Sequence, residues 1–178
     1  VSTDEPPLVQ MDYSFLGAAV ESQKRTILLG FALSCSSAFA HLARLKGGSD
    51  DVPIHAFAAW LEYIGLNGRI RLRSDNEGAI VAVARKIGAR RLQLCSSAFT
   101  LVETSCVGSS NSQGAVEGYA VTLAADARTW RQVVQARWQT AVLFTSPVFP
   151  WMFRQCAWVR DRFQPQGDGH TPYWHHQG

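Results

Sequence analysis

Three apolar segments follow one another near the start of the chain, with only short polar connections between them. Residues 8–16, 26–34 and 38–45 are each short and rich in apolar, β-branched and aromatic side chains, as β-strands are. Consecutive strands joined by short connections typically pair antiparallel. The start of the chain is therefore predicted to form an antiparallel meander. The rest of the fold is then expected to be built around a β-sheet.

Helical and strand patterns alternate after the meander. Apolar residues at helical spacing predict helices over residues 52–64, 79–91, 113–144 and 151–163, with short strands over residues 69–74 and 100–104. Strands separated by a helix pair in parallel, so we expect parallel pairing among the first, fourth and fifth strands. The predicted fold class is α/β: a five-stranded mixed sheet, a three-strand antiparallel meander plus two parallel strands, flanked by helices.

Length and composition indicate a single domain. The 178 residues suit one sizeable core, which we expect over about residues 8–163, followed by a Gly-, Pro- and His-rich loop or tail over residues 164–178. The chain opens on Val1, and we interpret it as an excerpt from a longer polyprotein. No apolar run approaches the roughly 20 residues of a membrane span, so no membrane partner is expected. The formal net charge of +3 does not by itself predict a nucleic-acid partner.

Three acidic residues stand at special places in this predicted fold. Asp12 interrupts the first strand, Asp75 follows the fourth strand, and Glu117 lies on the first turn of the long helix. Open α/β sheets place their sites at the carboxyl ends of strands. If the first and fourth strands are neighbours, Asp12 and Asp75 lie side by side, and the long helix brings Glu117 over them.

Clustered carboxylates predict a cation, because they repel one another unless a positive charge neutralises them. Ligands that are all oxygen favour Mg²⁺ or Mn²⁺ over zinc. Two such ions, roughly 3.5–4 Å apart, serve phosphodiester displacement in known enzymes. The pattern therefore predicts phosphoryl transfer on a polynucleotide. Taken singly, each acid also has an ordinary explanation, since an Asp at a strand end forms turns and a Glu in a first turn complements the helix dipole.

The segments around these acids resemble those of a known family. "VQMDYSF" at residues 9–15, "LRSDNEGAI" at 72–80 and "NSQGAVEG" at 111–118 are similar to the three signature segments of the retroviral and retrotransposon integrase catalytic core. The similarity is closer to copia-type retroelement polyproteins. The final "DGHTPYWHHQG" is similar to the segment that ends this core, and the resemblance covers nearly the whole chain.

The resemblance implies a ribonuclease-H-like fold and a DNA integrase, which is a polynucleotidyl transferase. It implies that Asp12, Asp75 and Glu117 are the catalytic residues and the ligands of two Mg²⁺ or Mn²⁺ ions. The family's turn before the glutamate contacts the DNA end, and here it corresponds to Asn111, Ser112, Gln113 and Gly114. The implied partners are the element ends, target DNA and further copies of the chain, as a homodimer or higher oligomer. The implied location is the nucleus, after passage through cytoplasmic particles.

The positive charges of the long helix depart from the family pattern. Retroviral members carry lysines one and two turns after the glutamate, where this chain has Val121 and Ala124. The same helix face continues to Arg128 and Arg131, which we interpret as substitute phosphate contacts, with exposed solubilising charges as the alternative. Three arginines alternate along the fourth strand and either meet DNA phosphates, pair with neighbouring acids or lie at a partly open edge: Arg69, Arg71 and Arg73.

Two other functions remain open from the sequence. The missing lysines and the small net charge favour a catalytically inactive or domesticated nucleic-acid-binding or assembly module of the same fold. The presence of all three acids argues for the enzyme. A ribonuclease of the same fold is the third alternative, although such enzymes carry a further acid within an early helix.

Overall fold

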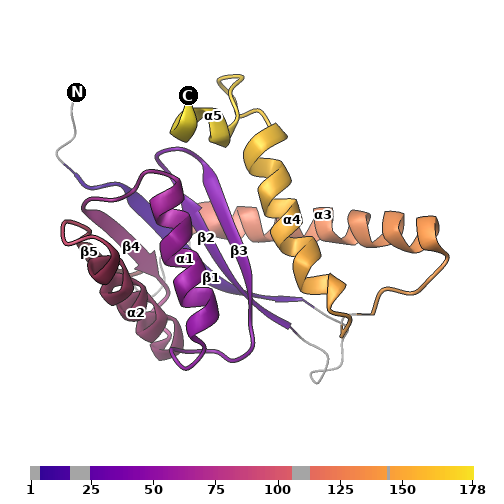
Figure 1. Ribbon diagram of the computed structural model, residues 1–178, viewed down its shortest axis with the longest axis horizontal. Helices are drawn as coiled ribbons and strands as arrows, with labels where there is room; N and C mark the ends of the chain where they lie inside the picture. Colours follow the sequence, from indigo (N-terminus) through magenta and orange to yellow (C-terminus); the bar gives the residue numbers. More distant parts are fainter. Residues whose placement is uncertain (1–4, 17–24, 106–112, 144) are drawn as a thin grey trace.

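The computed structural model describes residues 5–16, 25–105, 113–143 and 145–178. The described residues form five strands and five helices (Figure 1). The strands are β1 (Leu8–Leu16), β2 (Arg25–Ala32), β3 (Ser37–Ala43), β4 (Ile70–Ser74) and β5 (Thr100–Thr104). The helices are α1 (Asp51–Tyr63), α2 (Gly78–Leu94), α3 (Gly114–Trp138), α4 (Val148–Phe163) and α5 (Pro172–Gln177).

One mixed sheet organises the fold, with the strand order β3-β2-β1-β4-β5. Strands β1, β2 and β3 pair antiparallel as a meander, whereas β4 pairs in parallel with both β1 and β5. The predicted five-stranded mixed sheet is therefore confirmed, including the parallel pairing of the first, fourth and fifth strands. Strand β1 lies in the middle because it is the element that joins the meander to the parallel half.

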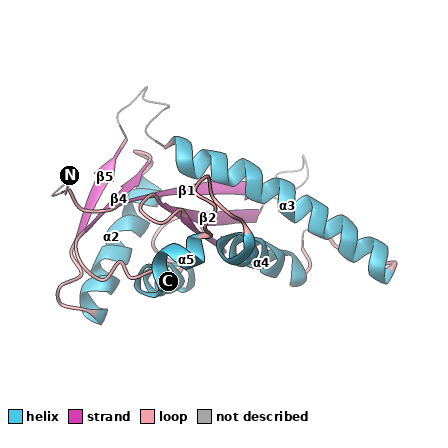
Figure 2. Cartoon of the chain, turned by 90° about the horizontal axis from the view of Figure 1, so that it is seen from above, coloured by secondary structure: helices cyan, strands magenta, loops and turns pink. Residues whose placement is uncertain are grey.

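Helix α3 lies on one side of the sheet and α2 on the other (Figure 2), while α4 packs against both α3 and β3. Val9, Met11 and Tyr13 of β1 share one buried cluster with residues of α1 and α2. Ile27 and Leu29 of β2 share the other cluster with residues of α3 and α4. Because side chains alternate across a strand, the even-numbered residues of β1 face α3. No helix among the described residues is long and apolar enough to span a membrane.

The long helical pattern over residues 113–144 ends earlier than the sequence predicts. Helix α3 stops at Trp138, and Gln139 takes a left-handed conformation with φ of 51°, which ends the helix. The last turns of α3 extend past the sheet (Figure 1), and several of their apolar side chains, including Trp130 and Trp138, are exposed. The apolar stripe predicted the helix correctly but could not locate its end.

The segment that follows α4 is more ordered than the loop we expected from the sequence. It ends in the short helix α5, where Thr171 is the N-cap, accepts a hydrogen bond from the Trp174 amide, and precedes Pro172 at the first helical position. His176 of this helix is 1% exposed and lies 3.3 Å from the buried carboxylate of Asp161 on α4. The tail is therefore packed against the domain through a buried contact.

Gly30 of β2 lies where helix α1 approaches the sheet most closely. A methyl group at this position would stand 2.6 Å from Cε2 of Phe57 and 2.7 Å from its Cζ. We expect Gly30→Ala to lower the free energy of unfolding by about 1–3 kcal/mol, because the overpacked ring has to shift. Chemical denaturation would measure the change.

Gly118 of α3 supplies the control for this prediction, since no atom lies within 4 Å of a methyl group built there. Gly118→Ala should stabilise the protein by about 0.5–1 kcal/mol, as expected for alanine in a helix interior. An equal effect of the two substitutions would contradict the close packing of α1 on β2.

Candidate catalytic carboxylate site

The parallel register of β1 and β4 places Asp12 beside Asp75. The last paired residues of the two strands are Gln10 and Arg73. Asp12 and Asp75 each lie two residues further on, so both continue the same face of neighbouring strands, which are spaced about 4.8 Å apart. Asp75 is the first residue after β4. The sequence prediction that these two acids are neighbours follows from this register.

Asp12 is partly buried, and its Oδ1 accepts a hydrogen bond of 2.7 Å from the Tyr13 amide. Asp75 is exposed, and its Oδ1 accepts a bond of 3.4 Å from the hydroxyl of Ser105, which follows β5. The fixed position of Asp12 in the middle of β1 contrasts with the exposure of Asp75 to solvent. An acid buried in a strand needs a compensating partner, whereas an acid at a strand end does not.

Glu117 reaches the same region from helix α3. It is exposed, and its amide donates to the carbonyl of Gln113 in the first turn. Helix α3 crosses the face of the sheet on which Asp12 lies (Figures 1 and 2). The three predicted carboxylates, from β1, β4 and α3, therefore lie toward the edge of the sheet at which β4 ends, near enough for Asp75 and Glu117 to act electrostatically on Asp12.

The electrostatics of Asp12 show that these acids interact. Burial raises the pKa of Asp12 most, the charges of Asp75, Glu117 and Glu77 add to this, and the hydrogen bond from the Tyr13 amide opposes it; together they move the pKa from 3.8 to about 6. Carboxylates that disfavour one another's ionisation mark a place where a cation binds favourably. Negative charge thus accumulates at this edge.

The donor set at this edge consists of carboxylate oxygens, which fits a hard divalent cation such as Mg²⁺ or Mn²⁺. Within residues 5–16, 25–105, 113–143 and 145–178, no three His, Cys, Asp or Glu side chains stand close enough together to form a ligand set. Asp75 and Glu117 are both exposed, so they can change rotamer without disturbing the core.

The predicted DNA-contacting turn is only partly described. Asn111 and Ser112 lie outside the described residues. Gln113 is 3% exposed, and neither polar atom of its side-chain amide has a hydrogen-bond partner in the described part of the chain. Gly114 begins α3 and is exposed, with open space around it. Gly114 is thus accessible to a ligand, whereas Gln113 points into the protein.

The two arginines predicted as phosphate contacts differ in their surroundings. Arg128 is exposed. Arg131 is partly buried, and its Nε donates to the side chain of Gln135 at 3.1 Å and to the carbonyl of Val142 at 2.8 Å. At a rise of about 1.5 Å per residue, these arginines lie roughly 16 and 21 Å along the helix from Glu117. Both lie further along α3 than Val121 and Ala124, and their contact with phosphates stays a prediction.

The sequence analysis missed a positive charge that the structure brings to this edge. Lys46, from the connection between β3 and α1, lies 2.8 Å from the Glu77 carboxylate and 4.7 Å from the ring centroid of Phe15. Glu77 occurs in the segment "LRSDNEGAI", two residues after Asp75, but nothing in the sequence pattern assigns Lys46 to it. Lys46 partly offsets the negative charge around Asp12.

The arginines of β4 pair with acids. Arg73 donates two hydrogen bonds, at 2.9 and 3.1 Å, to the same carboxylate oxygen of Glu103 on β5. Arg71 pairs with Glu5 and lies 3.9 Å from Glu103. Of the alternatives that the sequence left open, the structure favours ion pairing across the parallel strands.

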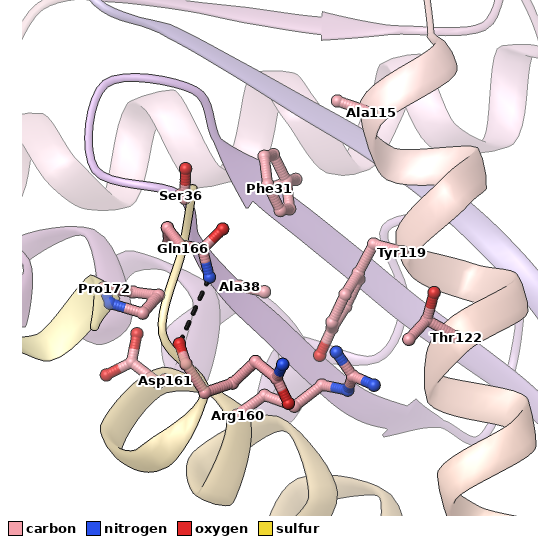
Figure 3. Close-up of a pocket in the computed structure, with 11 residues that line it drawn as sticks. Phe31, Ser36, Ala38, Ala115, Tyr119, Thr122, Arg160, Asp161, Gln166 and Pro172 are labelled. Atoms are coloured by element: carbon pink, nitrogen blue, oxygen red, sulfur yellow. Dashed lines mark hydrogen bonds between the residues drawn. The ribbon is translucent and has the colours of Figure 1, made fainter. Parts of the chain in front are cut away.

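A cavity of about 230 Å³ lies between α3, α4 and the tail (Figure 3). The helix contributes Ala115, Tyr119 and Thr122, and α4 contributes Arg160. Tyr119 points into the cavity; its hydroxyl is buried without a hydrogen-bond partner among the described residues. None of the three carboxylates lines this space, so it belongs to the packing of α3, α4 and the tail.

The structure resembles those of retroviral integrase cores. It matches the HTLV-2 integrase catalytic core domain in complex with magnesium with a TM-score of 0.63 at 13% identity, over 98% of this chain and 99% of that one. It matches the BIV integrase catalytic core domain with a TM-score of 0.56 at 16% identity, over 95% and 92%. It also matches a chain of the simian T-cell lymphotropic virus intasome with a TM-score of 0.69 at 12% identity, over 98% of this chain but only 55% of that one.

No protein-family model and no curated protein matches the sequence. At 12–16% identity, the likeness to the solved structures is one of fold. The copia-type similarity and the roles of the individual residues stay predictions. The sheet order, the parallel pairing of β4 and the full coverage agree on one conclusion: the chain has the ribonuclease-H-like fold of a retroviral integrase catalytic core.

Proposed function

We propose that the chain is the catalytic core of a retroelement integrase, a metal-dependent polynucleotidyl transferase that performs 3′-end processing and strand transfer of element DNA. The observation that supports this most is the proximity of Asp75 and Glu117 to Asp12, whose pKa is raised by burial and, in addition, by the charges of these two acids. Both the fold and the magnesium complex of the HTLV-2 core agree with the proposal.

The three carboxylates would hold two Mg²⁺ or Mn²⁺ ions. Bound ions of this kind supply Lewis-acid stabilisation to the attacking and leaving oxygens of a phosphodiester displacement. Asp12, fixed in β1 by its bond to the Tyr13 amide, provides the position from which the site is built. Asp75 and Glu117 are exposed, so a polynucleotide strand can reach them from solvent.

The reaction would have two displacements at phosphorus. In the first, water attacks a phosphodiester near the 3′ end of the element and releases a short fragment, leaving a free 3′-hydroxyl. In the second, this hydroxyl attacks a phosphodiester of target DNA, so that one P–O bond forms as another breaks. Both steps use the same carboxylates, because each needs the same charge stabilisation.

Contacts with DNA would extend from this edge. We assign the element end to the turn formed by Asn111, Ser112, Gln113 and Gly114, and more distant phosphates to Arg128 and Arg131. Joining two DNA ends requires at least two copies of the chain, and the HTLV-2 core is known in dimeric and trimeric forms. Insertion into chromosomal DNA would take place in the nucleus, after passage through cytoplasmic particles.

The second candidate is an inactive or domesticated nucleic-acid-binding or assembly module. Val121 is 71% exposed and Ala124 is partly buried, and neither supplies the positive charge expected beside Glu117. Lys46 provides one cation at this edge, but it is already paired with Glu77. DNA binding without chemistry would agree with this candidate.

The test uses two labelled DNA probes with Mn²⁺ or Mg²⁺. One is a duplex with a recessed 3′ end, offered with plasmid as the target. The other is a branched oligonucleotide that mimics the joined product and reports the reverse displacement. Asp75→Asn and Glu117→Gln should each lower both activities by roughly 10³-fold, since each removes several kcal/mol of transition-state stabilisation.

Glu62→Gln is the matched control, because it makes the same chemical change at an exposed position of α1. It should leave both activities unchanged. Activity that survives in Asp75→Asn or Glu117→Gln would contradict the assignment of the site. DNA binding without metal-dependent transfer by the unmodified chain would favour the binding module, and cleavage of only an RNA–DNA hybrid would favour a ribonuclease.

A further inference from the structure

Helix α3, which carries Glu117, lacks a cap from its own sequence in the described residues. Its N-cap is Gln113, with φ of −120°, and the side chain of Gln113 makes no capping bond there. The first amide groups of a helix have no partner within the helix, and they must find one elsewhere when they are buried. Val116, in the first turn of α3, is 0% exposed, so its amide is one of those that need a partner.

Strand β1 supplies one of these partners. The side-chain Oε1 of Gln10 accepts a hydrogen bond of 3.1 Å from the backbone amide of Val116. Gln10 is itself only 4% exposed. A buried bond of this kind holds its partners firmly, because breaking it leaves a polar group without water. The first turn of α3 is therefore attached to the centre of the sheet.

The two ends of this bond lie next to the predicted carboxylates. Gln10 is two residues before Asp12, so both side chains lie on the same face of β1. Val116 directly precedes Glu117 on α3. The bond thus joins a strand position beside Asp12 to a helix position beside Glu117, across 106 residues of sequence. Both segments are regular secondary structure, and one contact between them restricts the distance between the two acids.

We propose that Gln10 is a positioning residue, which sets the separation of Asp12 and Glu117 by anchoring the first turn of α3 to β1, and so determines how tightly the site binds a divalent cation. This inference rests on the function proposed above. The anchoring role also explains why the residue at position 10 is a glutamine. Asn would be one methylene too short to reach the Val116 amide, and Leu has no acceptor, whereas Glu has both the length and the acceptor.

The first arm of the test measures amide hydrogen exchange by NMR in the absence of metal and DNA. Gln10→Leu should accelerate exchange of the Val116 amide by roughly 10-fold relative to amides in the middle of α3, such as that of Leu123. Gln10→Glu should retain the protection. Met11→Leu, a volume-conserving change at a fully buried position on the other face of β1, controls for general loosening of the strand.

The second arm measures Mn²⁺ binding by calorimetry on the same proteins. Gln10→Leu and Gln10→Asn should weaken Mn²⁺ binding by roughly 10–100-fold, the effect of removing a residue that orients a ligand. Met11→Leu should leave the Kd unchanged. A role in stability alone would lower the melting temperature of Gln10→Leu without changing the Kd, and that result would overturn the inference.

The two arms separate this inference from the proposed function. Unchanged exchange of the Val116 amide in Gln10→Leu overturns the positioning role, whatever the chain does with DNA. If the unmodified chain binds no Mn²⁺, the proposed function fails, and the determination of cation affinity by Gln10 fails with it. If the unmodified chain binds Mn²⁺ and Gln10→Leu weakens that binding, but no strand transfer occurs, the inference holds and the assigned reaction is wrong.

Discussion

Asp12→Asn is expected to abolish strand transfer and at the same time to make the fold more stable at neutral pH. The carboxyl group has its ordinary pKa of 3.8 in the unfolded chain, whereas burial and the charges of Asp75, Glu117 and Glu77 raise the pKa to about 6 in the fold. Below pH 3.8 the group is protonated in both states and has no effect on stability. Between pH 3.8 and 6 the unfolded state ionises first, and above pH 6 the folded state bears the full cost of the charge.

Removing this charge should therefore raise the free energy of unfolding by about 1–2 kcal/mol near pH 8, after allowance for screening by water at this partly exposed carboxylate. The gain should disappear near pH 4. Urea denaturation at the two pH values measures it, and the strand-transfer assay should show a loss of roughly 10³-fold. A loss of stability at neutral pH would contradict the electrostatic account of the site.

Asp51→Asn is the control for this combination. Asp51 lies at the start of α1 and forms an exposed ion pair of 3.2 Å with Lys86. Its replacement should lower stability slightly, with no effect on activity. The proposed catalytic carboxylate and an ordinary surface carboxylate should thus differ in the sign of the stability change as well as in the effect on activity.

Asp161→Ala is expected to produce the largest loss of stability, roughly 3–4 kcal/mol. Asp161 is 6% exposed, and its Oδ1 accepts a bond of 2.6 Å from the Ser37 hydroxyl while its Oδ2 lies 3.3 Å from Nε2 of His176. The Ser37 oxygen in turn accepts from the indole of Trp60 at 3.3 Å. Alanine would leave this chain of buried polar groups without its central acceptor. Urea denaturation would show a lower midpoint with an unchanged slope.

The same tail contains a second Asp–His pair that serves as the control. Asp168 lies 2.9 Å from Nε2 of His175, and both side chains are largely or partly exposed. Asp168→Ala should leave the stability close to that of the unmodified chain, because water replaces the lost contact. Equal losses of stability for Asp161→Ala and Asp168→Ala would show that burial does not determine how much each Asp–His pair contributes to stability.

The sequence predicted those parts of the fold in which apolar residues recur at regular spacing along one strand or helix. The apolar alternation of β1 to β3 and the helical stripes of α1, α2 and α3 are repeated along the chain, so they can be read from it. The end of α3 has no such pattern, because Gln139 ends the helix by taking a left-handed conformation. Helix α5 did have a local signal, a Thr N-cap followed by Pro172, which the glycines and histidines around it obscured.

In the candidate site, too, some features could be predicted from the sequence and others could not. The positions of Asp12, Asp75 and Glu117 follow from strand order and helix placement, and a sequence can predict these. The partners of the site do not follow from any spacing. Gln10 meets Val116, and Lys46 meets Glu77, only because distant segments pack together. The same holds for Arg131, whose Nε donates to the carbonyl of Val142; its phosphate contact stays a prediction.

The pairing of β1 with β4 also determines when the proposed site can form during synthesis of the chain. The meander contains only neighbouring segments, so it can form as soon as β3 has left the ribosome, but β1 then presents an open edge until α1 and β4 follow. Contacts between distant segments form late, and unpaired edges invite association with other chains. The acids at positions 12, 75 and 117 come together only after α3 has docked. A nascent or truncated chain that ends before α3 therefore lacks one of the three carboxylates of the proposed site.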